Sequence, residues 1–216
     1  MIGHDFEFHS ERLIARASGA LWWPARRVLS VADLHFGKAQ RPALRGGAAL
    51  PPYDVADTLA RLEAEIAATD PISVICLGDS FDDHEAEARL TDRELSWLLR
   101  LMAGMDWVWI TGNHDPGPPA LGGRHLPEAQ LGPLWFRHMA TKAEAEVSAH
   151  FHPKARLPGG PARACFLIDG ARIILPAFGV YTGGLDCSAP LLRDLMRPDA
   201  RAVLTGTRAR AIPMPR

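Results

Sequence analysis

Three apolar segments of the chain end in the same way, each running directly into side chains that bind metals or transfer protons. Residues 27–32 run into Asp33-Leu34-His35, residues 72–77 into Gly78-Asp79, and residues 107–111 into Gly112-Asn113-His114-Asp115. In an open α/β sheet the carboxyl ends of parallel strands meet at one edge, and ligands bind there. The pattern therefore predicts that these polar side chains, which are far apart in the sequence, meet in one crevice.

The segments between these strands have the apolar spacing of amphipathic helices. One helix is predicted over residues 53–69, and another begins at Thr91, where Glu94 completes a capping box. Their apolar stripes are Val55, Leu59, Leu62 and Ile66 in the first helix, and Leu95, Leu98, Leu99 and Met102 in the second. The resulting β-α-β-α-β order predicts parallel strands with right-handed crossovers.

The remaining segments predict further strands. Residues 12–15 and 20–23 form an expected hairpin with Ser18-Gly19 at its turn. The second half has shorter apolar runs and looks more antiparallel. Its expected elements are strands at 134–140, 145–149, 164–168 and 172–175, a helix at 190–196 and a last strand at 202–205. Together the two halves indicate an α/β fold of layered sheets with helices outside.

Length and composition indicate an ordinary globular protein. The chain has 216 residues, 47% of them hydrophobic and 23% charged, and one domain is the default expectation. No apolar run is long enough for a membrane helix, and the first residues do not resemble a signal peptide. The cysteines, Cys76, Cys165 and Cys187, are odd in number and widely spaced, which favours buried free thiols. We therefore expect a cytoplasmic protein with no membrane partner.

The charge balance limits the ways in which the protein can bind nucleic acid. The formal net charge is −1, so no global positive field attracts the chain to DNA. This argues against a protein that coats DNA, but it leaves room for an enzyme that acts on DNA through a local basic rim. Arginine clusters at 26–27 and near the C-terminus fit such a rim and an ordinary solvated surface equally well.

The donor types at the strand ends indicate a metal centre. A mixture of carboxylate, imidazole and amide groups suits Mn²⁺, Fe or Zn²⁺ better than Mg²⁺ or Ca²⁺. Because residues i and i+2 of an extended chain face one side, Asp33 and His35 are expected to converge, as are His150 and His152. These donors are too many for one ion. Two ions about 3.5–4 Å apart, bridged by one carboxylate, would use them all.

Four motifs carry a resemblance to a known family. "DLH" at 33–35, "GDSFD" at 78–82, "GNHD" at 112–115 and "AHFH" at 149–152 resemble the calcineurin-like metallophosphoesterases. More narrowly, "DLHFGKA", "HFHPK" and "LPAFGVYTGGLD" resemble the bacterial ligase-associated DNA-repair phosphoesterases of the PdeM type. The resemblance implies a four-layer αββα sandwich, with two mixed β-sheets flanked by helices, and one phosphoesterase domain over residues 1–216.

The resemblance also implies a role for each site residue. Asp33, His35, Asp79 and His152 would hold the first metal, and Asp79, Asn113, His138 and His150 the second, with Asp79 bridging. His114 would face the substrate as a catalytic residue. Asp115 would orient its imidazole as a second catalytic residue.

Three further positions bear on the site. Asp82 or its neighbour Asp83 would support the site from outside the ligand shell. Lys38 either reaches a substrate phosphate or is an ordinary solvated loop lysine. Where the family usually has glycine before the His-x-His pair, this chain has Ala149.

The implied function is a two-metal phosphodiesterase or endonuclease, with Mn²⁺ the expected metal, acting on DNA in repair. An ATP-dependent DNA ligase, a helicase and an exonuclease are the expected functional partners. One alternative is a phosphatase or phosphodiesterase for a small, nucleotide-like substrate. Another is a non-catalytic scaffold, which the presence of His114 and of every expected ligand argues against. The short segments between motifs predict an open cleft rather than a capped one.

Overall fold

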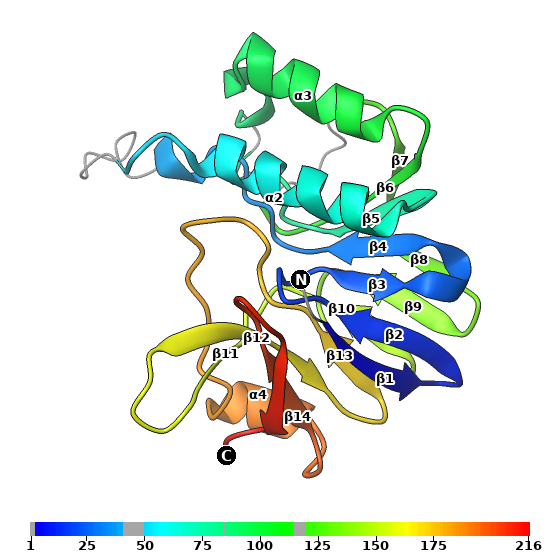
Figure 1. The fold of residues 1–216 in the computed structure, drawn as a ribbon, viewed down its shortest axis with the longest axis vertical. Helices are drawn as coiled ribbons and strands as arrows, with labels where there is room; N and C mark the ends of the chain where they lie inside the picture. The colour runs from blue at the N-terminus through cyan, green and yellow to red at the C-terminus, as the bar shows by residue number, and fades with distance from the viewer. Residues whose placement is uncertain (1–2, 41–49, 84, 115–119) are drawn as a thin grey trace.

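Two β-sheets packed face to face, with helices outside them, make up the computed structural model shown in Figure 1, which describes residues 3–40, 50–83, 85–114 and 120–216. In spatial order the strands of the first sheet are β1 (His4–Phe8), β2 (Glu11–Ala15), β3 (Leu21–Trp23), β4 (Val28–Val31), β5 (Ser73–Leu77), β6 (Asp106–Ile110) and β7 (Arg124–Leu126). Those of the second are β15 (Arg210–Pro213), β14 (Arg201–Leu204), β12 (Ala162–Ile168), β13 (Arg172–Ile174), β10 (Glu146–Ser148), β9 (Leu134–Arg137) and β8 (Glu128–Leu131), with β11 (Lys154–Arg156) on β12. The α-helices are α2 (Asp54–Thr69), α3 (Asp92–Met102) and α4 (Pro190–Leu195).

Both sheets are mixed. Strands β1 to β4 are antiparallel to one another, whereas β4 to β7 are parallel, as the β-α-β-α-β order predicts. The second sheet is mostly antiparallel, but β10 is parallel to both of its neighbours, β9 and β13. Apolar periodicity carries no information on strand direction, so it gave no sign of this parallel strand within the second half.

Three layers of buried side chains separate the four structural layers. One core lies between the helices α2 and α3 and the first sheet, and includes Leu59, Leu98 and Val74. The central core lies between the sheets, where Ile75 of β5 and Phe166 of β12 share one cluster. The third joins the second sheet to α4 through Leu192. Alternate residues of β5 thus face opposite cores, which confirms the expected αββα sandwich.

The two longer helices cover the first sheet from the outside. The capping box at Thr91 and Glu94 is present, and the stripe of α2 packs inward as predicted. The prediction for α3 was wrong at Leu99, which is 43% exposed, while Leu101 is buried instead. The buried face of α3 centres on Leu98, Leu101 and Met102, a spacing that follows i, i+3 and i+4.

The strands absent from the predictions are short or lie at sheet edges. They are β1, β7, β8, β11 and β15. All but β11 stand at the end of a sheet, and β11 pairs only with β12. Such strands are half exposed and polar, as in the alternating burial of β1, so they lack the continuous apolar run that marks an interior strand.

Two expectations from composition can be compared with this fold. Cys76, Cys165 and Cys187 are all buried and free, as predicted. Among the described residues, no helix combines the length and the apolar character that a membrane crossing requires.

Candidate metal centre

The predicted ligands come together at the carboxyl ends of the parallel strands. Asp33 and His35 follow β4, Asp79 follows β5, and Asn113 follows β6. The second sheet completes the group from across the sandwich. It supplies His138 after β9, and His150 and His152 after β10. The convergence expected from the strand ends is therefore present, and it draws on both sheets.

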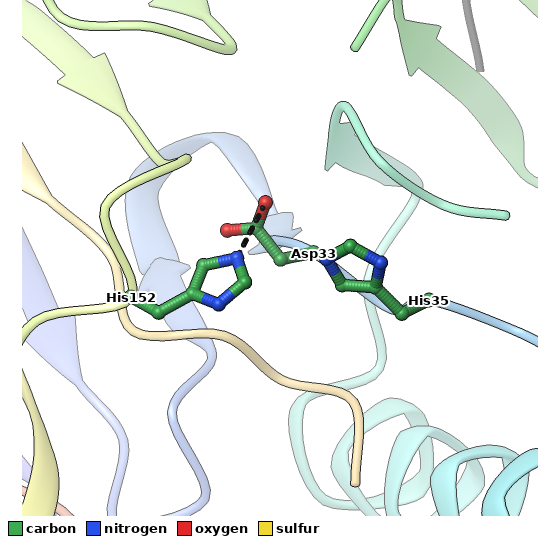
Figure 2. A group of neighbouring side chains, drawn as sticks. All are labelled: Asp33, His35 and His152. Atoms are coloured by element: carbon green, nitrogen blue, oxygen red, sulfur yellow. Dashed lines mark ion pairs between the residues drawn. The ribbon is translucent and has the colours of Figure 1, made fainter. Parts of the chain in front are cut away.

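One group of donors is formed by Asp33, His35 and His152. One donor atom from each of these side chains lies within 4.8 Å of the other two. Figure 2 shows the Asp33 carboxylate beside the ring of His152, where Oδ1 and Nε2 are 3.2 Å apart, with His35 on the other side of Asp33. These are three of the four side chains predicted for the first metal.

A second group of donors is formed by Asp79, His138 and His150, again within 4.8 Å of one another. Nε2 of His138 lies 3.4 Å from Oδ2 of Asp79 and 3.1 Å from Nδ1 of His150. The same nitrogen is 2.9 Å from Oδ1 of Asn113. The other three side chains predicted for the second metal therefore all contact Nε2 of His138.

The first donor group contains buried donor atoms that make no hydrogen bond. Nε2 of His35 is buried and makes no hydrogen bond, and Oδ1 of Asp33, also buried, has the ion-pair contact with Nε2 of His152 but no hydrogen bond. Leaving a buried polar atom unpaired costs about 1–3 kcal/mol, and such atoms in native proteins call for an explanation. Both belong to the first donor group. The two groups together suit a dinuclear divalent metal site.

In the second donor group, the buried carboxylates stabilise a positive charge on the neighbouring imidazole. Burial alone lowers the pKa of His138, but the hydrogen bond with Asp79 and the charge of Asp33 raise it to about 9. Burial alone raises the pKa of Asp79, yet the contacts with His138 and the main-chain N–H of His114 hold it well below its usual range. Burial lowers the pKa of His35, with partial compensation from Asp82. The buried carboxylates thus recruit a proton onto His138.

Five of the predicted ligands have left-handed backbone conformations. The φ angles are 50° at Asp33, 45° at His35, 47° at Asp79, 70° at His150 and 45° at His152. A residue other than glycine adopts this region at a cost of order 1–3 kcal/mol, and such residues cluster at functional sites. The side chains therefore do not converge through an extended i, i+2 geometry, as the sequence analysis assumed. Each ligand sits at a sharp kink, and His150 and His152 join different donor groups.

Main-chain hydrogen bonds hold these kinks in place. The N–H of Asp33 donates to the carbonyl of Gly78 at 3.2 Å, and that of His35 to the carbonyl of Asp79 at 2.9 Å. Gly78 itself has a φ of 75°, and a Cβ there would collide with the imidazole of His138. Glycine is therefore required both for the turn after β5 and for the close approach of a ligand from the second sheet.

Asp82 and Asp83 make different contacts. Asp82 is buried, and its Oδ1 lies 3.1 Å from Nδ1 of His35. Asp83 instead pairs with Arg89 at 2.6 Å, away from the donor atoms. Nζ of Lys38 lies 3.3 Å from the same Asp82 oxygen, so Lys38 contacts the carboxylate that supports His35.

His114 lies next to Asp79 and shares a third group of possible metal donors with His35 and Asp82. Its main-chain N–H donates to Oδ1 of Asp79 at 2.8 Å, and its Nε2 lies 4.0 Å from Oδ2 of the same residue. Nδ1 of His114 lies 3.0 Å from the main-chain carbonyl of Asp82. Asp115, the predicted orienting residue, lies outside the described residues. The partner seen on Nδ1 is a carbonyl, which no side-chain motif reveals.

Sequence reasoning also missed the segment 176–186, which packs against the loops that carry Asp33 and His152. The N–H of Phe178 donates to the carbonyl of Ala32 at 2.7 Å, and that of Gly179 to the carbonyl of Asp33 at 3.1 Å. A Cβ on Gly179 would collide with the carbonyl of Leu34. The signal for this segment lies in the glycines of "LPAFGVYTGGLD".

Ala149 fits its position without strain. Its φ angle is not positive, and its side chain is buried in the central core. Its N–H donates to the carbonyl of His138 at 2.8 Å. The methyl group that replaces the usual glycine therefore points into the core and leaves the kink at His150 intact.

Comparisons with known proteins agree with this geometry. Residues 26–187 match the family model described as calcineurin-like phosphoesterase. Among solved structures, the chain is similar to the crystal structure of Pseudomonas putida nuclease MPE, with 30% sequence identity and a TM-score of 0.80. That match covers 97% of this chain and 100% of the other. No curated protein matches the chain in a sequence search. The resemblance and the fold class expected from the sequence are confirmed.

Proposed function

Because the chain belongs to the calcineurin-like phosphoesterase family, we propose that it hydrolyses phosphodiester bonds in DNA with two divalent metal ions, of which Mn²⁺ is the first choice. Family membership and the likeness to a nuclease support a metal-dependent phosphoesterase. The observation that carries the proposal is the pair of donor groups, which stand side by side at the strand ends.

The proposed ligand sets follow the two donor groups. Asp33, His35, Asp79 and His152 hold the first ion, and Asp79, Asn113, His138 and His150 hold the second. Asp79 is assigned to both because its carboxylate contacts His138 of the second group and its main-chain carbonyl accepts from the N–H of His35 in the first. The mixture of oxygen and imidazole donors favours Mn²⁺, with Fe and Zn²⁺ as alternatives.

The proposed reaction is an in-line displacement at the phosphorus of a diester. When bound, two divalent ions activate water as a nucleophile and neutralise the phosphoryl oxygens. Asp82 fixes the ring of His35 through Nδ1 and so directs Nε2 toward the centre. His114 donates through Nδ1 to the carbonyl of Asp82, which leaves Nε2 for the leaving oxygen or for the charge that develops there. We also assign Asp115 a supporting role at His114.

The substrate proposal extends beyond the chemistry of the centre. The name of the similar structure, a nuclease, favours a polymer over a small ester. We propose internal cleavage of DNA in repair, with an ATP-dependent DNA ligase, a helicase and an exonuclease as functional partners, in the cytoplasm. Residues 1–216 are proposed to act as one phosphoesterase domain. The second candidate is hydrolysis of a small, nucleotide-like phosphate ester, since the same metal chemistry serves both.

A substrate panel with Mn²⁺ tests the proposal. Circular single-stranded DNA has no free ends, so its linearisation reports internal cleavage only. Nucleotides and phosphomonoesters are assayed beside it under the same conditions. We expect cleavage of the circle and of simple diesters. Efficient turnover of one small phosphomonoester, with the circle untouched, would replace this proposal by the second candidate.

A further inference from the structure

We propose that Glu146 is a positioning residue for the second metal ion, and that it acts by holding His138 and His150 at the spacing that one ion requires. The inference rests on the proposed function, because it starts from the ligand set proposed for that ion. It goes further by naming the side chain that sets the geometry of the ligands.

The crossover that carries His138 is short. Residues 138–145 join β9 to β10, and these neighbouring strands are parallel. A connection between parallel neighbours usually takes about a dozen residues or more and often forms a helix. Residues 138–145, all of which the structure describes, contain no helix. The shape of this crossover therefore depends on contacts other than helical hydrogen bonds.

The carboxylate of Glu146 closes the crossover. It accepts from Nη1 of Arg137 at 2.8 Å and from the main-chain N–H of Thr141 at 2.9 Å. Oγ1 of Thr141 also donates to it. Arg137 comes directly before His138, and Thr141 lies a few residues after it. One side chain thus ties together the chain on both sides of a proposed ligand.

Strand β10 connects the same carboxylate to a second ligand. Glu146 begins this strand, and His150 follows its end. Between them, the N–H of Ala149 donates to the carbonyl of His138 at 2.8 Å. The contact of 3.1 Å between Nε2 of His138 and Nδ1 of His150 therefore depends on the alignment of β9 with β10. Glu146 holds that alignment through Arg137.

Glu146 acts from the face of the second sheet that is turned away from the first. Phe136 and Val147, the neighbours of Arg137 and Glu146 along their strands, belong to the central core between the sheets. Because successive residues of a strand face opposite sides, Arg137 and Glu146 lie on the outer face. Glu146 is fully buried there. It therefore influences the donor groups through the strands that carry them.

A second cation completes this buried charge cluster. Arg172 of β13 is buried, and its Nε lies 3.6 Å from Oε2 of Glu146. Its Nη2 donates to the carbonyl of Ala143, within the crossover, at 3.4 Å. Buried ion pairs often add little net stability, and in some proteins they instead fix one arrangement of the chain. Contacts at both Thr141 and Ala143 favour the second role here, because they hold the crossover itself.

The test compares Mn²⁺ binding by the wild type, Glu146→Gln and Thr141→Val. Glutamine keeps the shape of Glu146 but turns an NH₂ group toward donors of Arg137 or Thr141, so one contact must be lost. Thr141 is exposed, and valine removes only its hydroxyl, so this variant decides the question if Glu146→Gln does not fold. Glu65→Gln is the matched control, since Glu65 is an equally buried carboxylate that pairs with Arg16 and belongs to α2.

Two measurements separate alignment of the ligands from general stability. Calorimetric titration gives the affinity of each ion, and EPR spectroscopy distinguishes a magnetically coupled pair of Mn²⁺ ions from a single ion. Denaturant unfolding of the metal-free variants gives their stability. A merely structural role of Glu146 would weaken both ions together, whereas a positioning role weakens the second ion alone.

We expect Glu146→Gln to weaken the second ion about tenfold, the lower end of the range for residues that support metal ligands, and to leave the first ion unchanged. The EPR signal of the coupled pair should give way to that of a single ion. Thr141→Val should show a smaller change in the same direction. Glu65→Gln should bind both ions as the wild type does, even where it lowers stability.

Wild-type affinity for both ions in Glu146→Gln, or in Thr141→Val if the first variant does not fold, would overturn the inference. Equal losses of both ions, or a selective loss in Glu65→Gln, would overturn it as well. Activity toward circular single-stranded DNA is assayed separately. If the wild type binds two ions but cuts no DNA, the proposed function fails and the role of Glu146 stands.

Discussion

The buried carboxylate of Asp82 lies 3.1 Å from Nδ1 of His35, a residue that carries its own predicted donor atom, Nε2, on the opposite side of the ring. This carboxylate–imidazole contact fixes both the orientation and the tautomer of His35. The main-chain carbonyl of Asp82 orients His114 in the same way. Asp82 thus contacts both a proposed ligand and the proposed catalytic histidine, and it shares a group of possible metal donors with them.

Asp82→Ala is therefore expected to weaken the centre without emptying it. Removing such a support typically costs about 10–100-fold in metal affinity or activity. Asp83→Ala is the control, because Asp83 pairs with Arg89 at the surface. Mn²⁺ titration followed by diesterase assay measures both effects. Equal losses in the two variants would mean that the contact with His35 is not what matters.

The glycine after β5 gives a prediction about the fit of the second sheet. Gly78 and Gly104 both have left-handed φ angles, 75° and 78°, so alanine strains the backbone at either position. Only at Gly78 would the added methyl also strike His138, since nothing lies within 4 Å of the corresponding position at Gly104.

Gly104→Ala should therefore lower the free energy of unfolding by about 1 kcal/mol and leave metal binding intact. Gly78→Ala should lower it further and also weaken metal binding. Denaturant unfolding and metal titration of both variants measure the difference. Equal behaviour of the two variants would show that the contact with His138 imposes no constraint.

His114→Ala should separate metal binding from catalysis. His114 contacts Asp79 through its main-chain N–H, which alanine retains, so both ions should stay bound. The rate should fall about 10²–10⁴-fold, the usual range for a general acid–base group. If His114 protonates the leaving oxygen, the loss should shrink for p-nitrophenol, a good leaving group. A variant that lost its metal would instead identify His114 as a ligand.

Metal binding should release protons. The pKa of His138 is raised to about 9 in the metal-free chain, so the residue is protonated at neutral pH. A metal ligand must be neutral, and binding therefore expels this proton. Apparent Mn²⁺ affinity should rise with pH and level off as pH passes 9. Calorimetry in buffers of different ionisation enthalpy counts the protons released, and a count of zero near pH 7 would contradict a protonated His138 in the metal-free chain.

Much of the site could be predicted from sequence because the fold brings the ends of its parallel strands to one edge. Asp33, Asp79 and Asn113 each end an apolar run, and that pattern is local. His138 was expected only from the resemblance, because it arrives from the second sheet through an ordinary strand. The kinks that aim His35 and His152, and the carbonyl that orients His114, depend on main-chain geometry that residue types do not encode. The segment 176–186 was missed for the same reason, since it acts through its backbone.

The central claim is that Asp79 bridges two metal ions, and metal content tests it most directly. Elemental analysis of Mn²⁺-loaded protein should find two ions per chain in the wild type. Asp79→Asn keeps the side-chain shape but removes the shared negative charge, so this variant should hold fewer ions and lose nearly all diesterase activity, while circular dichroism reports an unchanged fold. Two tightly bound ions in Asp79→Asn, together with wild-type activity, would contradict the account.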